Sequence, residues 1–184
     1  MTDMATKLVF VGEMGAGKTT AIRAISDMEP ISTEMPISDE AALEALDGKS
    51  HTTVALDYSS IELGDGELLH VYGVPGQAYL DFMWPIVAEG AIGVIVLVSA
   101  LNPRALPSTL TLLEQFRALA PEACFAVGVT CQDRQPDFHF GQFRDALAQG
   151  GYRLPVMWVD ARESVQVDFL VKALLSCRYA EAVA

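Results

Sequence analysis

Residues 12–19 read Gly-Glu-Met-Gly-Ala-Gly-Lys-Thr, which satisfies the pattern G-x-x-x-x-G-K-[ST] of a phosphate-binding loop. The loop follows the apolar run Leu8-Val9-Phe10-Val11, and a helical pattern continues after it from Thr20 to Asp27. A strand, a glycine-rich loop and a helix in this order form the context in which the motif binds phosphate. The sequence therefore predicts a site for a nucleoside triphosphate or diphosphate.

Each residue type in this loop has a physical task. Glycines let the backbone curl so that successive N–H groups point at a phosphate, and the helix N-terminus adds partial positive charge. We expect Lys18 to reach the β- and γ-phosphates and the Thr19 hydroxyl to ligate Mg²⁺. The nucleotide-contacting residues predicted for this stretch are Gly12, Gly15, Ala16, Gly17, Lys18, Thr19 and Thr20.

The composition is typical of a compact globular chain, because 51% of the 184 residues are hydrophobic and 20% are charged. This length suits one α/β unit, and we expect a single domain over residues 1–184. The longest apolar stretch, Ala91 to Leu101, is about half of what a membrane-spanning helix needs. The chain shows no secretory signal, and its three scattered cysteines are typical of reduced thiols. These features predict a cytoplasmic protein.

The formal net charge of −12 is concentrated in one part of the chain. Residues 24–103 contain 13 Asp and Glu residues and one basic residue, Lys49, whereas the charges of the remaining chain balance. Such a field repels nucleic acid and anionic lipid and attracts a basic partner. We therefore expect no nucleic-acid binding. Two interpretations of the acidic region stay open, a partner surface and simple solubility.

Strand and helix patterns alternate along the chain, with one tight hairpin at 64–66 and a long connection over 28–50. Pro85 is expected to bend or end the helix in which it lies. Strands are predicted at 7–11, 54–63, 67–72, 91–100, 123–130 and 155–159, and helices at 18–27, 79–89, 106–119, 141–149 and 165–180, with one or two further turns at 38–48. This alternation predicts a three-layer α/β fold of the P-loop NTPase type. Its six-stranded sheet is mainly parallel, with one antiparallel hairpin between the second and third strands.

The layout resembles the Ras-like small GTPases, and most closely the bacterial gliding-motility (MglA-like) type and the Arf-like members, which share the early hairpin. The resemblance covers nearly the whole chain. It implies a nucleotide-dependent molecular switch that binds GTP and GDP with Mg²⁺ and hydrolyses GTP weakly. It also implies a roadblock-domain protein as the regulatory partner, and an effector that binds the acidic switch face.

The switch segments of this family match the chain unevenly. Thr53 resembles the threonine that meets Mg²⁺ and the γ-phosphate, with Thr52 as the reserve candidate. Gly76 resembles the glycine whose N–H contacts the γ-phosphate, and Gln77 the glutamine that orients the attacking water. Gly73 stands where the family has its metal-side aspartate. This leaves Thr19 and Thr53 as the predicted metal ligands, and Lys18 and Gln77 as the predicted catalytic residues.

The base-binding loops are also partly retained. Asp133 resembles the carboxylate that accepts two N–H bonds from guanine, while Thr130 and Cys131 replace the Asn and Lys that precede it in the family. The last loop, Asp160-Ala161-Arg162, resembles Ser-Ala-Lys. The Ala161 N–H is expected at the base oxygen, and Arg162 is expected to cover the base face.

Hydrolysis is expected to be slow, because no arginine lies between Arg23 and Arg104 to act as a finger from a switch segment. Two alternatives to a GTPase switch stay open. One is a nucleotide-binding scaffold that does not hydrolyse GTP, and the other is a small-molecule kinase. The lid arginines of such a kinase would be Arg134, Arg144 and Arg153.

Overall fold

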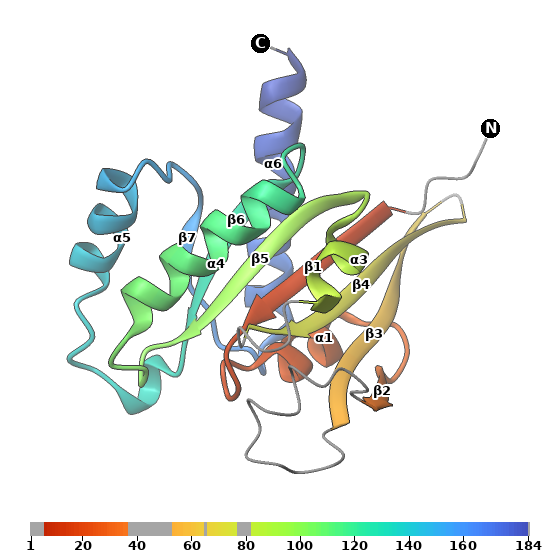
Figure 1. Ribbon diagram of the computed structural model, residues 1–184, viewed down its shortest axis with the longest axis horizontal. Helices are drawn as coiled ribbons and strands as arrows, with labels where there is room; N and C mark the ends of the chain where they lie inside the picture. Colours follow the sequence, from red (N-terminus) through yellow and green to blue (C-terminus); the bar gives the residue numbers. More distant parts are fainter. Residues whose placement is uncertain (1–5, 37–52, 65, 77–81, 184) are drawn as a thin grey trace.

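A computed structural model describes residues 6–36, 53–64, 66–76 and 82–183 (Figure 1). One sheet organises these residues, with the strand order β2-β3-β4-β1-β5-β6-β7. The strands are β1 (Thr6–Gly12), β2 (Ile31–Pro36), β3 (Thr53–Gly64), β4 (Glu67–Pro75), β5 (Ala91–Ser99), β6 (Cys124–Thr130) and β7 (Val156–Trp158). The helices are α1 (Lys18–Ile25), α3 (Trp84–Ala88), α4 (Ala105–Leu119), α5 (Phe140–Gln149) and α6 (Ser164–Val183), with a 3₁₀ turn, η2, at Gln132–Arg134.

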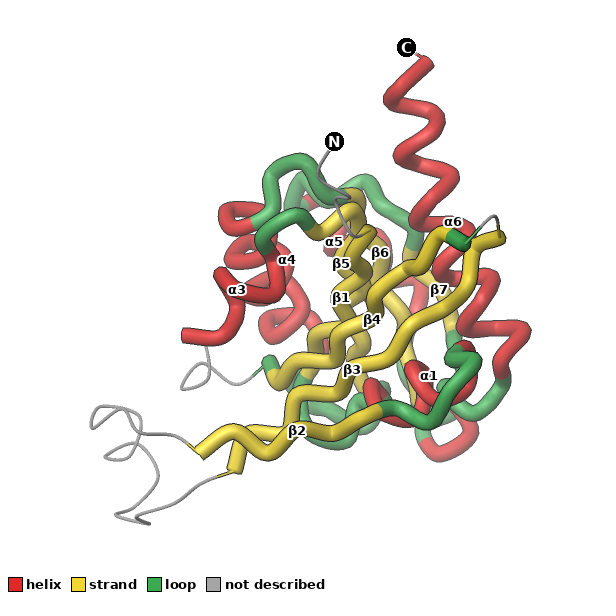
Figure 2. Tube along the Cα trace, turned by 90° about the vertical axis from the view of Figure 1, so that its right-hand side faces the viewer, coloured by secondary structure: helices red, strands yellow, loops and turns green. Residues whose placement is uncertain are grey.

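The predicted fold class is confirmed. Strands β4, β1, β5, β6 and β7 pair in parallel, and β3 and β4 form the predicted antiparallel hairpin. Strand β2 is an addition to the six predicted strands, and it pairs antiparallel with β3 at the edge of the sheet (Figure 2). Its sequence falls in the segment that we interpreted as a long connection. The possible helical turns at 38–48 lie outside the described residues.

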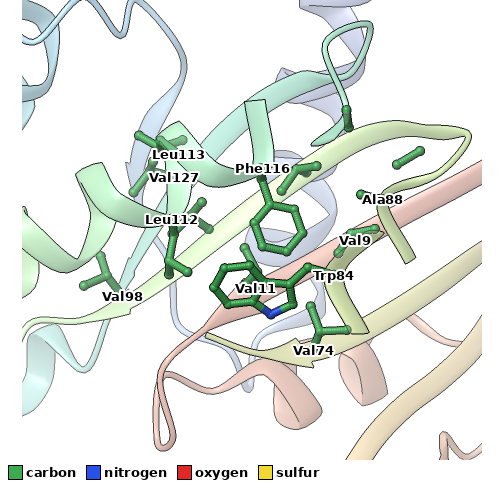
Figure 3. Packing of buried hydrophobic residues seen from close by; sticks show 14 of the residues in the cluster. Val9, Val11, Val74, Trp84, Ala88, Val98, Leu112, Leu113, Phe116 and Val127 are labelled. Carbon is green, nitrogen blue, oxygen red and sulfur yellow. The ribbon is translucent and has the colours of Figure 1, made fainter. Parts of the chain in front are cut away.

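Central strands have both faces buried, as their continuous apolar sequences predict. On β1, Val9 and Val11 face the cluster formed with α3, α4 and α5, while Leu8 and Phe10 face the cluster formed with α1 and α6. Figure 3 shows the first cluster, in which the Trp84 ring lies against Phe116 with the ring centroids 5.1 Å apart. Two helical layers therefore enclose the sheet.

We expected Pro85 to bend or end its helix. Instead, Pro85 occupies the first turn of α3. A proline fits there because the first N–H groups of a helix have no intrahelical acceptor and the proline ring already sets a helical φ. Within the described ranges, no helix has both the length and the apolar composition that crossing a bilayer requires.

The carboxyl ends of the parallel strands meet at one edge of the sheet, where ligands bind in open α/β sheets. Five loops gather at this edge. They follow β1, β4, β5, β6 and β7, and they begin at Gly12, Pro75, Ser99, Thr130 and Trp158. Four of these loops carry motifs that the sequence analysis singled out.

Candidate functional site

The phosphate-binding loop has the expected geometry between β1 and α1. Gly15 and Gly17 adopt φ angles of 79° and 94°, in the left-handed region that glycine tolerates best. Gly17 is also the N-cap of α1, and no side chain caps the first N–H groups of that helix. Ala16, within the loop, is buried. The loop and the helix N-terminus thus present backbone donors to one point, as an anion site requires.

Lys18 is the first residue of α1, and its side chain bonds the start of the loop. Its ammonium donates to the carbonyl oxygens of Gly12 and Glu13, at 2.8 and 3.0 Å. Burial lowers the pKa of Lys18 to about 8, although the negative charges of Asp57 and Glu13 act in the opposite direction. An incoming phosphate would add negative charge beside the ammonium and raise this pKa.

A carboxylate that the sequence analysis missed completes the phosphate side. The Thr19 hydroxyl donates a hydrogen bond to Oδ2 of Asp57, which projects from β3 and is only 4% exposed. Asp57 pairs in register with Gly73 of the neighbouring strand β4. A carboxylate is therefore present beside the position where the family has its aspartate, on the next strand.

Steric contacts explain why residue 73 itself is glycine. A Cβ atom on Gly73 would lie 2.6 Å from Ile22 Cδ1 and 3.1 Å from the Asp57 Cβ atom. A side chain at residue 73 would therefore force the end of the Ile22 side chain on α1 to shift and would compete with Asp57 for the same space. Asp57 and Ser59 are buried polar residues on β3, so a signal for Asp57 existed in the sequence, as a carboxylate at an inward position of a strand.

The donor set fits magnesium. Within the described part of the chain, no group of three or more His, Cys, Asp or Glu residues could hold a metal ion by itself. Mg²⁺ does not need such a group, since it commonly binds through one or two carboxylates, phosphate oxygens and water. The Thr19 hydroxyl and the Asp57 carboxylate supply two oxygens of the required kind.

The predicted threonine ligand is less directly placed. Thr53 is the first residue of β3, and its backbone pairs with Pro36 of β2. It lies four positions before Asp57, which corresponds to about 13 Å along an extended strand. Thr52 and Gln77 lie outside the described residues. The roles of these three residues stay predictions.

The glycine of the third loop lies beside the phosphate-binding loop. The Gly76 N–H donates to the Gly12 carbonyl oxygen at 2.9 Å, which is the same oxygen that accepts from Lys18. The preceding carbonyl, of Pro75, accepts a 3.0 Å hydrogen bond from the indole Nε1 of Trp84. Trp84 is buried against Phe116, so this loop is anchored to the core that Figure 3 shows.

A cavity of about 390 Å³ opens beside the phosphate-binding loop. It joins the loop residues to the ends of β6 and β7, and to the start of α6. Its lining residues include Gly15, Gly17, Thr20, Thr130, Cys131, Asp133, Asp160, Ala161, Arg162 and Gln166. The structure thus brings Asp133, Ala161 and Arg162 together with the phosphate-binding loop around one cavity. Their assignment to a base stays a prediction.

Two contacts connect this cavity to the phosphate-binding loop. Buried Thr130 donates its hydroxyl to the Ala16 carbonyl oxygen at 3.0 Å. Ala161 packs so closely against Gly17 that a Cβ atom on that glycine would lie 3.0 Å from the Ala161 Cβ atom. The ends of β6 and β7 are therefore held against the loop that would carry the phosphates.

Charged side chains line the mouth of the cavity. Arg162 bonds Asp160 through Nε and Nη2, at 2.8 and 2.6 Å, and reaches Asp133 Oδ2 at 3.2 Å. Hydrogen bonds from the side chain and backbone of Arg162 lower the pKa of Asp160 to about 2. The carboxylates of Asp160 and Asp133 in turn raise the pKa of Arg162. Asp160 and Arg162 are therefore fully charged at neutral pH.

Comparison with solved structures finds the same fold in the G domain of the T. maritima FeoB iron transporter. The TM-score is 0.63 at 15% sequence identity, and the match covers 94% of this chain and 98% of that one. No protein-family profile and no curated protein sequence matches the chain. The likeness, together with the strand order, establishes that the chain has the fold of a GTPase G domain.

Proposed function

We propose that residues 1–184 act as one G domain, a molecular switch that binds GTP and GDP and hydrolyses GTP slowly. The observation that carries this proposal is the shared cavity of the phosphate-binding loop and the Asp133 carboxylate. A nucleotide with its phosphates on Lys18 and the α1 N-terminus would extend its base toward Asp133. A carboxylate accepts two hydrogen bonds from the adjacent N–H groups of guanine, whereas adenine has no such pair.

Side chains of the phosphate side have distinct roles in this proposal. Lys18 binds the β- and γ-phosphates, and Thr19 and Asp57 are the residues that would hold Mg²⁺. Thr53, about 13 Å from Asp57 along β3, would be a third ligand only if this segment changed conformation. When bound, the metal ion neutralises charge on the phosphate oxygens. The contact of the Thr19 hydroxyl with buried Asp57 supports the first two of these three assignments. The third rests on the resemblance alone.

Hydrolysis transfers the γ-phosphoryl group to water. The water oxygen bonds to the γ-phosphorus, the bond to the β,γ-bridging oxygen breaks, and GDP and phosphate leave. Gln77 would orient the water, and Lys18 would stabilise charge on the phosphates. Residues 24–103 contain no arginine, which favours slow turnover without a partner.

The switch itself would depend on Gly76. Its N–H is donated to the Gly12 carbonyl oxygen, and a γ-phosphate would compete for the same N–H. Binding of GTP would therefore move the loop that Trp84 anchors, whereas binding of GDP would leave it in place. A roadblock-domain regulator and an effector on the acidic switch face are the partners that the resemblance favours.

The proposal is tested by titrating GTP, GDP, ATP and ADP onto the purified chain in Mg²⁺. We expect guanine nucleotides to bind at least tenfold more tightly than adenine nucleotides. Adenine cannot donate the two hydrogen bonds to the charged Asp133 carboxylate, and the loss of such bonds is costly. Asp133→Ala should remove this preference, and Asp137→Ala is the matched control, because Asp137 is an exposed carboxylate outside the cavity. Tighter binding of ATP than of GTP would contradict the proposal.

Phosphate release then separates a slow GTPase from a scaffold that does not hydrolyse GTP. We expect slow release that a roadblock-type protein accelerates, and Gln77→Ala should suppress it. The absence of release under both conditions would leave nucleotide binding intact but favour the scaffold.

A further inference from the structure

The Asp133 carboxylate needs a group that holds it in place. It lies on the short turn η2, and its side chain is 56% exposed. Thr130 lies three residues before it, but the Thr130 hydroxyl donates to the carbonyl oxygens of Ala16 and Val98. Cys131 precedes the turn with a φ of 61° and offers only a thiol. Among the residues that the structure describes, the one side chain that bonds Asp133 is that of Arg162.

Arg162 is itself fixed at several points. Its backbone N–H and its Nε both donate to Asp160 Oδ1, at 2.9 and 2.8 Å, and its Nη2 donates to Oδ2 at 2.6 Å. Asp160 is tied in turn to α6, because its backbone N–H donates to Gln166 Oε1 at 2.9 Å. The guanidinium is therefore preorganised before it reaches Asp133, which reduces the entropy lost in that contact.

We propose that Asp160 and Arg162 form an ionic clamp that orients Asp133, and that this clamp sets the preference for guanine. The inference rests on the proposed function of the same site. Arg162 and Asp160 are positioning residues in this account, while Asp133 is the group that contacts the base. Arg162 takes one lone pair of Oδ2, which leaves Oδ1 and the remaining pair of Oδ2 for the two N–H groups of guanine.

The clamp should act mainly on the second of the two hydrogen bonds between Asp133 and guanine. The bond to the 2-amino group of guanine depends on the orientation of the carboxylate, because both oxygens must lie in the plane of the base. Hypoxanthine has no 2-amino group, so IDP tests the same pocket without that bond. Loss of the clamp should therefore lower the affinity for GDP more than the affinity for IDP.

The experiment measures the dissociation constants of GDP and IDP for the full chain and for Arg162→Ala. We expect the ratio of the two affinities to fall about fivefold in the variant, a part of what a hydrogen bond to a charged group contributes. Arg162→Lys should recover part of the ratio, because a lysine keeps the charge but not the planar fork. In an Asp133→Ala background, Arg162→Ala should leave the ratio unchanged.

Arg134→Ala is the matched control. Arg134 lies on the same turn as Asp133 and lines the same cavity, but no ion pair involving it is present in the described part of the chain. Its removal changes the local charge equally and should leave the ratio within a factor of two, as expected of an exposed charge without a partner. An equal fall in Arg134→Ala would show a general charge effect and would overturn the clamp.

Other outcomes would also refute the inference. An equal loss of GDP and IDP affinity in Arg162→Ala would show that the arginine only covers the base. A gain in GDP affinity would show that Arg162 obstructs Asp133. Failure of the unmodified chain to prefer guanine nucleotides would instead refute the proposed function, so the two failures are separated by the first titration.

Discussion

The phosphate side and the base side of the candidate site are built from different kinds of contact. On the phosphate side, Thr19 bonds a carboxylate that is only 4% exposed, and Lys18 is partly buried. On the base side, Asp133 and Arg162 have side chains that are 56% and 65% exposed. Buried polar contacts are costly to break, whereas exposed ion pairs are weak and screened by salt. The proposed phosphate site is therefore built from contacts that are costly to break, and the proposed base site from contacts that are easily changed.

The largest expected effect comes from Asp57→Ala. We expect GDP affinity in Mg²⁺ to fall about 100-fold, since one buried, charged partner of Thr19 is removed. The affinity measured in EDTA should change much less. Asp137→Ala, at an exposed site, is the control. Equal losses with and without Mg²⁺ would show that Asp57 supports the fold and not the metal site.

Gly73→Ala tests the packing that places the carboxylate on β3. The new Cβ atom would lie 2.6 Å from Ile22 Cδ1, so we expect a loss of about 1–3 kcal/mol in the free energy of unfolding. Urea denaturation measures it. Gly141→Ala is the matched control, because no atom lies within 4 Å of a Cβ at residue 141. Equal stability of the two variants would remove the steric reason for Gly73.

The pH dependence of binding tests Lys18. Its pKa is lowered to about 8, and phosphate binds the protonated form, so GDP affinity should fall about fourfold between pH 7 and 8.5. Without nucleotide, the unfolded chain binds more protons between pH 8 and 10.5, so the free energy of unfolding should rise with pH there. An Arg at residue 18 does not titrate in this range, so Lys18→Arg should give a flat affinity profile. A flat profile for the unmodified chain would contradict the burial effect.

The smallest effect is the response of the base side to salt. Raising NaCl from about 0.05 to 0.5 M shortens the Debye length and should lower the ratio of GDP to IDP affinity about twofold. Inorganic pyrophosphate, which contacts the phosphate side alone, provides the comparison. If salt left the nucleotide ratio unchanged, the exposed ion pair between Arg162 and Asp133 would not control the base site.

Local patterns predicted most of this structure. The phosphate-binding loop, the hairpin and the apolar strands follow from glycine spacing and hydrophobic periodicity, and the structure confirms the fold class. Strand β2 was missed because Ile31–Pro36 is short, ends in a proline and lacks a clear alternation. Its partner β3 stabilises it as a strand, through pairing that a single segment does not reveal.

The missing parts of the site depend on residues far apart in the chain. Asp57 and Thr19 are separated by 38 residues, and Arg162 and Asp133 by 29. The family motif has a carboxylate where this chain has Gly73, and the strand register places the Asp57 carboxylate beside that position, on the neighbouring strand. The prediction of Arg162 at the base site came from its position after Ala161. Its hydrogen bonds to Asp160 and Asp133 could not be predicted, because they depend on how the loops after β6 and β7 lie relative to each other.

Competition between GDP and ADP for the unmodified chain in Mg²⁺ tests the central claim most directly. With a fluorescent guanine nucleotide prebound, GDP should displace it at a concentration at least tenfold lower than ADP does, because only guanine satisfies both oxygens of Asp133. Displacement by ADP at an equal or lower concentration would contradict a guanine-nucleotide switch.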